Sequence, residues 1–258
     1  MISKLIKLPI FKRLIPSILV RFLKTFKKNR GFFKVKDIEM YLDFLDPIDR
    51  QIILNQSYEV EELNIFEDLI KKNSSNYLLD IGANCGYYTF FILKNNPKLK
   101  VLAYEPNNEA HFKFLETLKK NEMLKESITL FNYGLSNTNS EMMLHSKVKF
   151  GYAQTGGSSV ETDRNGKSQI AKFKLGDDVL NFKNENLAIK IDVEKHELKT
   201  LQGMHNLIRQ NNIILQIEIC EKNLQTVTHY LNNAGFKLIA DVKKRSNYYF
   251  TNNNISQN

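Results

Sequence analysis

The sequence predicts an α/β fold built on a doubly wound, mostly parallel sheet of seven strands that ends in an antiparallel hairpin. Three observations predict it: short apolar runs alternate with amphipathic helical stretches, a glycine-containing turn follows the first core run, and a short polar segment joins the last two runs. At 258 residues, 42% of them hydrophobic, the chain is long enough for one such domain with a single large core.

The chain divides into a basic arm, one α/β domain and a short tail. Residues 1–36 contain eight Lys, three Arg and no acidic residue, a charge of +11; since the whole chain carries +9, residues 37–258 sum to −2. A domain so close to neutral argues against an extended nucleic-acid-binding surface. We expect the domain to cover residues 37–251 and the Asn-rich tail, residues 252–258, to be disordered.

The arm carries a helical pattern of apolar residues. They recur at three- and four-residue steps and predict a basic amphipathic helix, interrupted or started near Pro16: Phe11, Leu14, Ile15, Ile18, Leu19, Phe22, Leu23 and Phe26. Such a helix either lies on an anionic membrane surface or packs on its own domain or on a second subunit. It does not span a bilayer, because its longest uncharged run, residues 14–20, has seven residues. With two cysteines and no disulfide framework, we expect a cytoplasmic protein, free or peripheral at the inner face of a membrane.

The elements of the domain follow in chain order from the spacing of apolar residues. An extended stretch over 38–44, a turn at Asp46-Pro47 and a helix over about 60–72 lead into the core. Strands are expected at 77–81, 100–104, 128–133, 187–192 and 213–219, and a closing hairpin at 236–241 and 247–251. Helical spacing covers 87–94, 108–121, 196–210 and 222–234. A Gly/Ser-rich insertion at 141–175, with two short strands around 152–159, is either a substrate lid or a mobile hairpin tip.

The turn after the first core strand predicts a cofactor site. The strand ends at Asp80, and the chain then passes through Gly82, Asn84 and Gly86 into a helix. Glycine lacks a Cβ, so the backbone can bend sharply and approach a ligand closely, and the helix start offers unpaired amide donors. The Asp80 carboxylate suits a cationic ligand better than a phosphate, and the Gly-x-Gly-x-x-Gly and P-loop patterns are absent. The turn therefore favours S-adenosylmethionine over a dinucleotide or over a turn that only packs.

A second acidic residue strengthens this prediction. The next strand ends at Glu105-Pro106, 25 residues after Asp80, where a carboxylate can accept both ribose hydroxyls of an adenosine moiety; the alternative is a solvated loop carboxylate. We predict S-adenosylmethionine as the cofactor, bound by Asp80, Gly82, Asn84, Gly86, Tyr87, Thr89, Glu105 and Asp192.

Further acidic residues follow the next two strands of the predicted sheet. Asp192, Glu194, His196 and Glu197 come after one strand and Glu218 ends the other, at the edge where doubly wound sheets bind ligands. Beside a sulfonium, a carboxylate can hold the cofactor's amino group or take the proton of an attacking hydroxyl. Asp192, Glu194 and His196 are the candidate catalytic residues, although a histidine beside a helix start is more often structural. Candidate substrate-binding residues are Glu59, Ser158 and Glu218. No metal ligand is assigned, and a divalent metal between Asp192 and Glu218 is left as an alternative.

These motifs, taken in this order, resemble the FkbM family of S-adenosylmethionine-dependent methyltransferases, which have the class I, Rossmann-like methyltransferase fold. The resemblance covers roughly residues 38–240 and rests on Asp80 to Thr89, Glu105 to Asn107, Ile191 to Glu194 with Glu197, and Gln216 to Glu218, with Tyr58-Glu59 and Asp177-Asp178 fitting the same pattern. The sequence departs from the family at Lys195-His196, where the family usually has Gly after Asp-Val-Glu.

The resemblance implies O-methylation, often of sugars in glycans or in polyketide products. We therefore predict an S-adenosylmethionine-dependent O-methyltransferase that acts on a hydroxyl of a glycan or glycolipid. Methylation of RNA or of a small molecule is the alternative within the same chemistry, disfavoured for RNA because no Asn/Asp-Pro-Pro-Tyr motif is present. The alternative from another class is a catalytically inactive, membrane-docked binding protein of the same fold.

Overall fold

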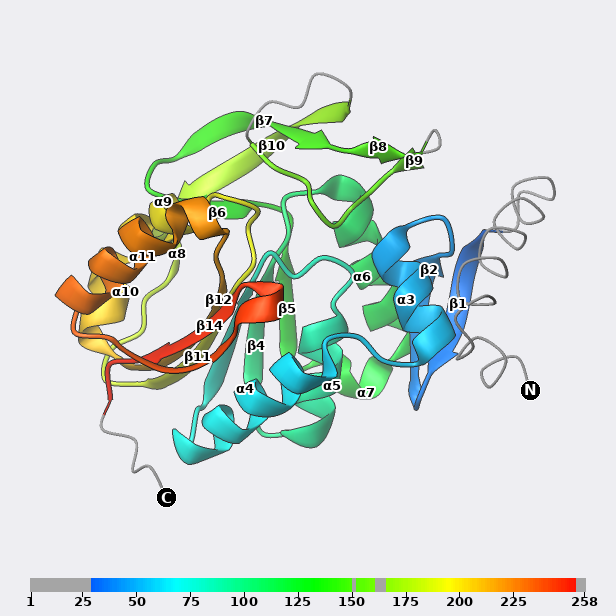
Figure 1. The fold of residues 1–258 in the computed structure, drawn as a ribbon. Coiled ribbons are helices and arrows are strands. Elements are labelled where there is room, and N and C mark those ends of the chain that lie inside the picture. Colours follow the sequence, from blue (N-terminus) through cyan, green and yellow to red (C-terminus); the bar gives the residue numbers. More distant parts are fainter. Residues whose placement is uncertain (1–28, 150–151, 161–165, 254–258) are drawn as a thin grey trace.

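A seven-stranded sheet forms the centre of the protein in the computed structural model, which describes residues 29–149, 152–160 and 166–253 (Figure 1). Its strands lie in the order β13 (Lys237–Val242), β14 (Asn247–Thr251), β12 (Asn212–Glu218), β11 (Asn186–Ile191), β3 (Tyr77–Ile81), β4 (Lys100–Tyr104) and β5 (Ile128–Phe131). The five strands from β12 to β5 are parallel, and β14 runs antiparallel to both of its neighbours. The predicted sheet and its closing hairpin are confirmed, and the last strand of the hairpin lies inside the sheet, between β12 and β13.

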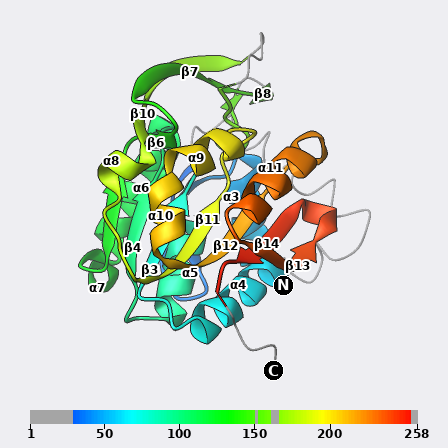
Figure 2. The ribbon, with the colours of Figure 1, turned by 90° about the vertical axis from the view of Figure 1, so that its left-hand side faces the viewer.

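Helices cover both faces of this sheet, which explains why its parallel strands are apolar along their whole length. One face packs against α4 (Val60–Lys72), α5 (Tyr87–Asn95), α6 (Asn108–Lys120) and α7 (Glu122–Lys125). The other packs against α8 (Gly176–Val179), α9 (Glu197–Gly203), α10 (His205–Gln210) and α11 (Glu221–Asn233), and Figure 2 shows α9, α10 and α11 in front of the sheet. Each face of the sheet has its own hydrophobic core, and successive residues of a strand point to opposite faces. Leu78 packs into the core on the side of α4 to α7, and Leu79 into the core on the side of α8 to α11. The predicted helix over 196–210 is two helices, α9 and α10, separated at Met204.

The segment before the sheet differs from the sequence prediction. β1 (Arg30–Val35) pairs antiparallel with β2 (Ile38–Asp43), so the predicted boundary of the arm at residue 36 falls inside a hairpin; residues 1–28 lie outside the described residues. A helix, α3 (Pro47–Asn55), follows where a turn was expected. The Asp46 Oδ1 atom accepts a hydrogen bond from the Ile48 amide at 3.0 Å, and Pro47 takes the first helical position, which needs no amide donor. Asp46-Pro47 is therefore a helix start.

The insertion is more extensive than the two short strands expected around 152–159. A second sheet has the order β6 (Gly134–Ser136), β10 (Lys167–Leu175), β7 (Ser140–Ser146), and β8 (Val148–Lys149) pairs with β9 (Tyr152–Ala153). Figure 1 shows β7, β10, β8 and β9 at the top of the molecule, beyond the central sheet. The chain from Thr155 to Val160 returns from it to line a cleft at the carboxyl ends of the central strands.

At the other end, the first residues of the predicted disordered tail are ordered. The Asn252 side chain accepts a hydrogen bond from the Ile213 amide at 2.7 Å, and Asn253 Nδ2 donates to Asn73 Oδ1 at 3.3 Å. Residues 254–258 lie outside the described part of the chain. Among the described helices, none is both long and apolar enough to cross a membrane.

Candidate functional site

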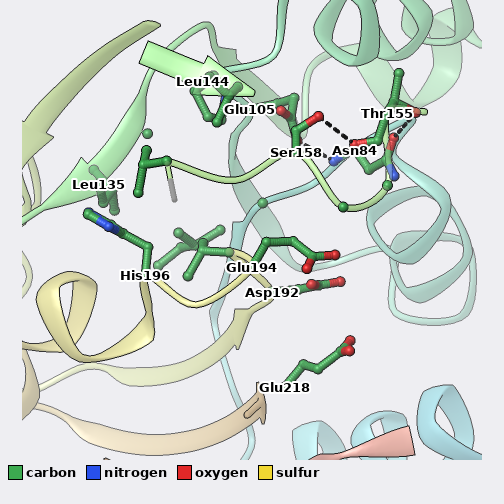
Figure 3. Close-up of a pocket in the computed structure, with 18 of the residues that line it drawn as sticks. Asn84, Glu105, Leu135, Leu144, Thr155, Ser158, Asp192, Glu194, His196 and Glu218 are labelled. Carbon is green, nitrogen blue, oxygen red and sulfur yellow. Dashed lines mark hydrogen bonds between the residues drawn. The ribbon is translucent and has the colours of Figure 1, made fainter. Parts of the chain in front are cut away.

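A cleft of about 870 Å³, part of it open to solvent, lies at the carboxyl ends of β3, β11 and β12 (Figure 3). This is the edge at which doubly wound sheets bind ligands. Its walls come from the turn after β3, the segments after β11 and β12, the loop before α4, and residues 155–160 of the insertion. The cleft contains nine of the residues singled out in the sequence: Glu59, Gly82, Asn84, Glu105, Ser158, Asp192, Glu194, His196 and Glu218.

The glycines after β3 allow protein segments to pack closely together. Gly82 has φ +85°, and a Cβ there would lie 1.9 Å from the Asp192 carbonyl oxygen, so only glycine lets the ends of β3 and β11 meet. Gly86 has φ +84°, and a Cβ would lie 2.7 Å from the rings of Phe90 and Phe114. Gly82 lines the cleft and Gly86 does not. At Gly86 the missing Cβ makes room for the two core rings, so the geometry gives this glycine a packing role, and a contact with the ligand there stays a prediction.

Asp80 and Thr89 lie beneath the turn. Asp80 is buried, and its Oδ2 accepts a 2.6 Å hydrogen bond from the Thr89 hydroxyl in the first turn of α5. Burial raises the pKa of Asp80, against the opposing effect of nearby Lys190. Neither Asp80 nor Thr89 lines the cleft. Both therefore hold the turn to the helix that follows. Tyr87 lines a smaller side pocket, and its hydroxyl accepts a hydrogen bond from the Tyr58 amide at 3.0 Å.

Glu105 lies in the wall of the cleft with both carboxylate oxygens directed by backbone amides. Oε2 accepts from the Asn84 amide at 2.7 Å and Oε1 from the Asn107 amide at 2.8 Å. Burial raises the pKa of Glu105 to about 7, although these amides oppose the shift. Each carboxylate oxygen can accept more than one hydrogen bond, so the side chain keeps the capacity to accept from a pair of hydroxyls.

Four further carboxylates converge on the cleft from three elements, and we call Glu59, Asp192, Glu194 and Glu218 the carboxylate cluster. Figure 3 shows Asp192, Glu194 and Glu218 directed into the same space. Burial, followed by the negative charge of Asp192, raises the pKa of Glu194 to about 7 and that of Glu218 to about 9. Because the raised pKa values reflect dehydration and mutual repulsion, a cationic ligand would stabilise these carboxylates in their ionised form.

A buried lysine, which the sequence analysis did not single out, lies beneath the cluster. Lys190 Nζ is 3.1 Å from Asp192 Oδ2 and 4.7 Å from the centre of the Tyr88 ring. Burial would lower the pKa of Lys190, but the carboxylates of Asp192, Asp80 and Glu59 raise it by more, so the lysine is charged. A lysine in the middle of an otherwise apolar strand was the available signal, because a lysine is almost never fully buried without a partner.

Four non-glycine residues in or next to the cleft have a strained backbone. Glu59, Asn84, Glu194 and Lys195 have φ values of +43°, +50°, +47° and +77°, in the left-handed region that favours glycine. Such conformations persist only where the surrounding structure holds them, and they cluster at functional sites. Lys195 stands where the resembled family usually has glycine, and its amide donates to Glu197 Oε1 at 2.6 Å. The left-handed φ at this position explains why glycine suits it.

His196 does not lie with the carboxylates. Its Nε2 is 2.9 Å from the Ser136 hydroxyl, and its ring centre is 5.5 Å from that of Phe173. Figure 3 shows the imidazole beside Leu135, directed away from Asp192 and Glu194. Burial lowers the pKa of His196 to about 4, so the ring is neutral at pH 7 and a weak proton acceptor. The geometry gives His196 a place in the wall of the cleft and does not support its selection as a base.

The tip of the insertion is fixed to the domain by a buried polar network. The Thr155 hydroxyl and amide both donate to Asp46 Oδ2, at 2.7 and 2.9 Å, and Lys113 Nζ donates to the Thr155 oxygen at 3.0 Å. Lys113 Nζ also lies 2.6 Å from Asp49 Oδ2. The Ser158 hydroxyl accepts from Asn107 Nδ2 at 2.9 Å. Ser158 was expected at the site, but the network that positions the tip was not, because its members are far apart in the sequence.

Within the described ranges, no group of three or more His, Cys, Asp or Glu side chains is arranged to hold a metal ion. A metal that bridges Asp192, Glu218 and an acceptor would have only two protein ligands, so that alternative stays a prediction.

A family profile, the methyltransferase FkbM domain, matches residues 80–238. The chain belongs to this family. It is an S-adenosylmethionine-dependent methyltransferase, as the fold and the family together show. Among curated proteins, the hexuronic acid methyltransferase AglP of Haloferax volcanii is 23% identical over 198 residues, which cover 74% of this chain and 77% of that protein.

Among solved structures, the methyltransferase FkbM of Methylobacillus flagellatus KT superposes with a TM-score of 0.51 at 17% identity. The match covers 69% of this FkbM-family chain but 43% of that longer chain, so it supports the fold alone.

Proposed function

We propose that this methyltransferase transfers a methyl group to a hydroxyl oxygen of a carbohydrate. The carboxylate cluster is the observation that carries the proposal, because a sugar hydroxyl is a very weak acid and its methylation gains from a base positioned at the attacking oxygen. The name of the haloarchaeal relative, a hexuronic acid methyltransferase, supports a sugar as the acceptor class.

The cleft has the two kinds of surface that S-adenosylmethionine requires. An apolar part, formed by Pro106, Leu135, Leu144, Val160 and Phe173, suits the faces of a purine, and Glu105 adjoins it, where ribose hydroxyls would reach its oxygens. The carboxylate cluster suits the sulfonium and the amino group, since both are cationic. When bound, the cofactor supplies an activated methyl group and a neutral thioether as leaving group. Gly82 and Asn84 would contact it, and Asp80, Gly86, Tyr87 and Thr89 would maintain the shape of the turn.

Within the cluster, we assign the proton acceptor to Glu194. Its pKa of about 7 matches a general base that works near neutral pH, and its left-handed backbone, with φ +47°, aims the carboxylate into the cleft. Asp192, held 3.1 Å from Lys190, would hold the amino group of the cofactor. Glu59, Glu218 and Ser158 are left to bind the acceptor.

Methyl transfer from labelled S-adenosylmethionine to a panel of glycans and model glycosides tests the proposal. Glu194→Gln should lower kcat by about 10²–10⁴-fold, the range expected for a general base, with little change in cofactor affinity. Glu105→Ala should weaken cofactor binding measured by calorimetry. Glu126→Gln, an exposed residue before β5 at the opposite edge of the sheet, is the matched control. Methylation of RNA in place of every glycan, or full activity of Glu194→Gln, would contradict the proposal.

We further propose that the basic arm brings the domain to the inner face of an anionic membrane, where lipid-linked sugars are available. The charge of +11 over residues 1–36 supports it. Binding to phosphatidylglycerol vesicles should weaken as salt is raised, and deletion of residues 1–28, which leaves β1 intact, should abolish it. Vesicle binding that survives the deletion would assign the arm to another role.

A further inference from the structure

We infer that the acceptor is a neutral or amino sugar rather than a sugar acid, because the charged side chains around the acceptor's place in the cleft are carboxylates. The inference rests on the proposed function, since it concerns the acceptor of the same reaction. Glu194 and Glu218 are the residues that set this preference.

The charged side chains that line the described part of the cleft all have the same sign. Among its described lining residues, Glu59, Glu105, Asp192, Glu194 and Glu218 are the charged side chains, and all five are acidic. They come from separate segments of the chain, so their convergence is a property of the fold and not of one acidic stretch. Burial and Asp192 raise the pKa of both Glu194 and Glu218, the expected response of carboxyl groups that lack enough positive charge nearby.

Among the described residues, two cations near the cleft, Lys190 and Arg245, are paired with carboxylates. Lys190, which lines the smaller side pocket, is 3.1 Å from Asp192 and lies over the Tyr88 ring. Arg245 Nε is 3.0 Å from Glu62 Oε1, and its Nη1 is 3.9 Å from Glu59 Oε1. Lys147 and Lys195 lower the pKa of Glu194, yet neither lines the cleft, and the pKa of Glu194 is raised in their presence. In the described part of the chain, therefore, no lysine or arginine lines the cleft where it would meet the carboxylate of a sugar acid.

The charge of the bound cofactor does not cancel the excess of acidic side chains in the cleft. S-adenosylmethionine carries a sulfonium, an ammonium and a carboxylate, a net charge of one positive unit. Its positive groups favour the ionised form of the cluster, and its net charge together with that of Lys190 amounts to two positive units against up to four carboxylates. An acceptor carboxylate would therefore meet like charge at close range, which suppresses the wrong partner. A neutral sugar avoids the repulsion, and a protonated amino group would be attracted.

The bond changes favour the same acceptor. As the acceptor oxygen forms its bond to the methyl carbon, the carbon–sulfur bond breaks, its electron pair stays on sulfur, and the hydroxyl proton passes to the Glu194 carboxylate. The carboxylate oxygen of a sugar acid has no proton to lose, so a base beside the reacting atom would serve no purpose. A base within the cluster is useful for a hydroxyl only.

The experiment compares 4-nitrophenyl glucoside, glucosaminide and glucuronide as acceptors of labelled methyl groups. We expect kcat/KM for the glucuronide to be at least tenfold below that for the glucoside, with the glucosaminide equal to or better than the glucoside. Glu218→Gln removes a carboxyl group that the bound, cationic cofactor favours in its ionised form, and it leaves the base in place, so it should narrow the difference in kcat/KM between glucuronide and glucoside. Glu126→Gln, at the far edge of the sheet, should leave the ratio unchanged.

A glucuronide methylated as well as the glucoside, with a ratio insensitive to Glu218→Gln, overturns the inference and leaves the proposed function standing. If none of the three glycosides is methylated, the proposed function fails on this panel, and saturation-transfer NMR with bound S-adenosylmethionine decides the inference separately. Weaker binding of the glucuronide then supports the charge preference, and equal binding refutes it.

Discussion

Replacement of Lys113 by Met should separate the tip of the insertion from the domain. Lys113 is 2% exposed, and its Nζ lies 2.6 Å from Asp49 Oδ2, 3.6 Å from Asp46 Oδ2 and 3.0 Å from the Thr155 hydroxyl. Methionine keeps most of the length of the side chain and removes its charge. Two buried carboxylates are then left without their counter-ion.

The size of the effect follows from this burial. Removal of one partner of a buried ion pair costs about 3–5 kcal/mol, because the remaining charge stays dehydrated. For a domain of this size each kcal/mol lowers Tm by roughly 2–4 °C, so Tm should fall by roughly 6–20 °C. Burial already raises the pKa of Asp49 to about 6 with Lys113 present, so its pKa in the variant should be higher still. The difference in unfolding free energy between wild type and variant should therefore be smaller below pH 6, where the Asp49 carboxyl group is protonated in both proteins.

Urea unfolding followed by circular dichroism at pH 8 and pH 5 measures both effects. The double variant Lys113→Met/Asp49→Leu should recover part of the stability, because it also removes the Asp49 carboxylate that has lost its counter-ion. Cofactor affinity should fall in the single variant, since Thr155 positions the residues that line the cleft. A loss below about 1 kcal/mol at pH 8, or a double variant no more stable than the single one, would refute the assignment of Lys113 as a buried counter-ion.

Three further predictions concern the cleft. Gly82→Ala should reduce cofactor affinity by more than about tenfold in calorimetry, because its Cβ would lie 1.9 Å from a backbone oxygen after β11; unaltered binding would mean that this approach is not needed. The apoprotein should lose stability as pH rises from about 6.5 to 9, because Glu194 and Glu218 have raised pKa values and bind protons more tightly when folded. Saturating cofactor should flatten this Tm profile, and a stability that rises over the same interval contradicts it. Lys195→Gly should raise the free energy of unfolding by about 0.5–1 kcal/mol by relieving the φ of +77°, whereas Lys195→Ala should give no gain.

The core of the fold was predictable because its signals are local. The strands at 77–81, 100–104 and 247–251 have the bounds expected from their apolar runs. The start of α3 could also have been predicted, because Asp followed by Pro is typical of a helix N-terminus as well as of a turn. We expected the turn, and the structure has the helix. β1 was assigned to the basic arm because it has only six residues, contains Arg30 and Lys34, and follows directly on a helical pattern of apolar residues.

The cleft was predictable in composition but less so in geometry. The acidic residues follow strand ends, and parallel strands bring their carboxyl ends to one edge, so Asp192, Glu194 and Glu218 could be expected to converge. The direction of a side chain just past a strand depends on the turn there. The left-handed residues Glu194 and Lys195 rotate His196 toward Ser136, and nothing in the local sequence encodes that rotation.

The position of β14 has a consequence for how the protein is made. β14 is the last strand of the sheet to be synthesised, yet it lies between β12 and β13 and pairs with both. Until its residues have left the ribosome, β12 presents an unpaired edge and β13 has no neighbour, a state exposed to mispairing with other chains. Completion of the sheet is thus a late event in biosynthesis, and a nonsense codon shortly before Asn247 would remove an interior strand rather than trim an edge.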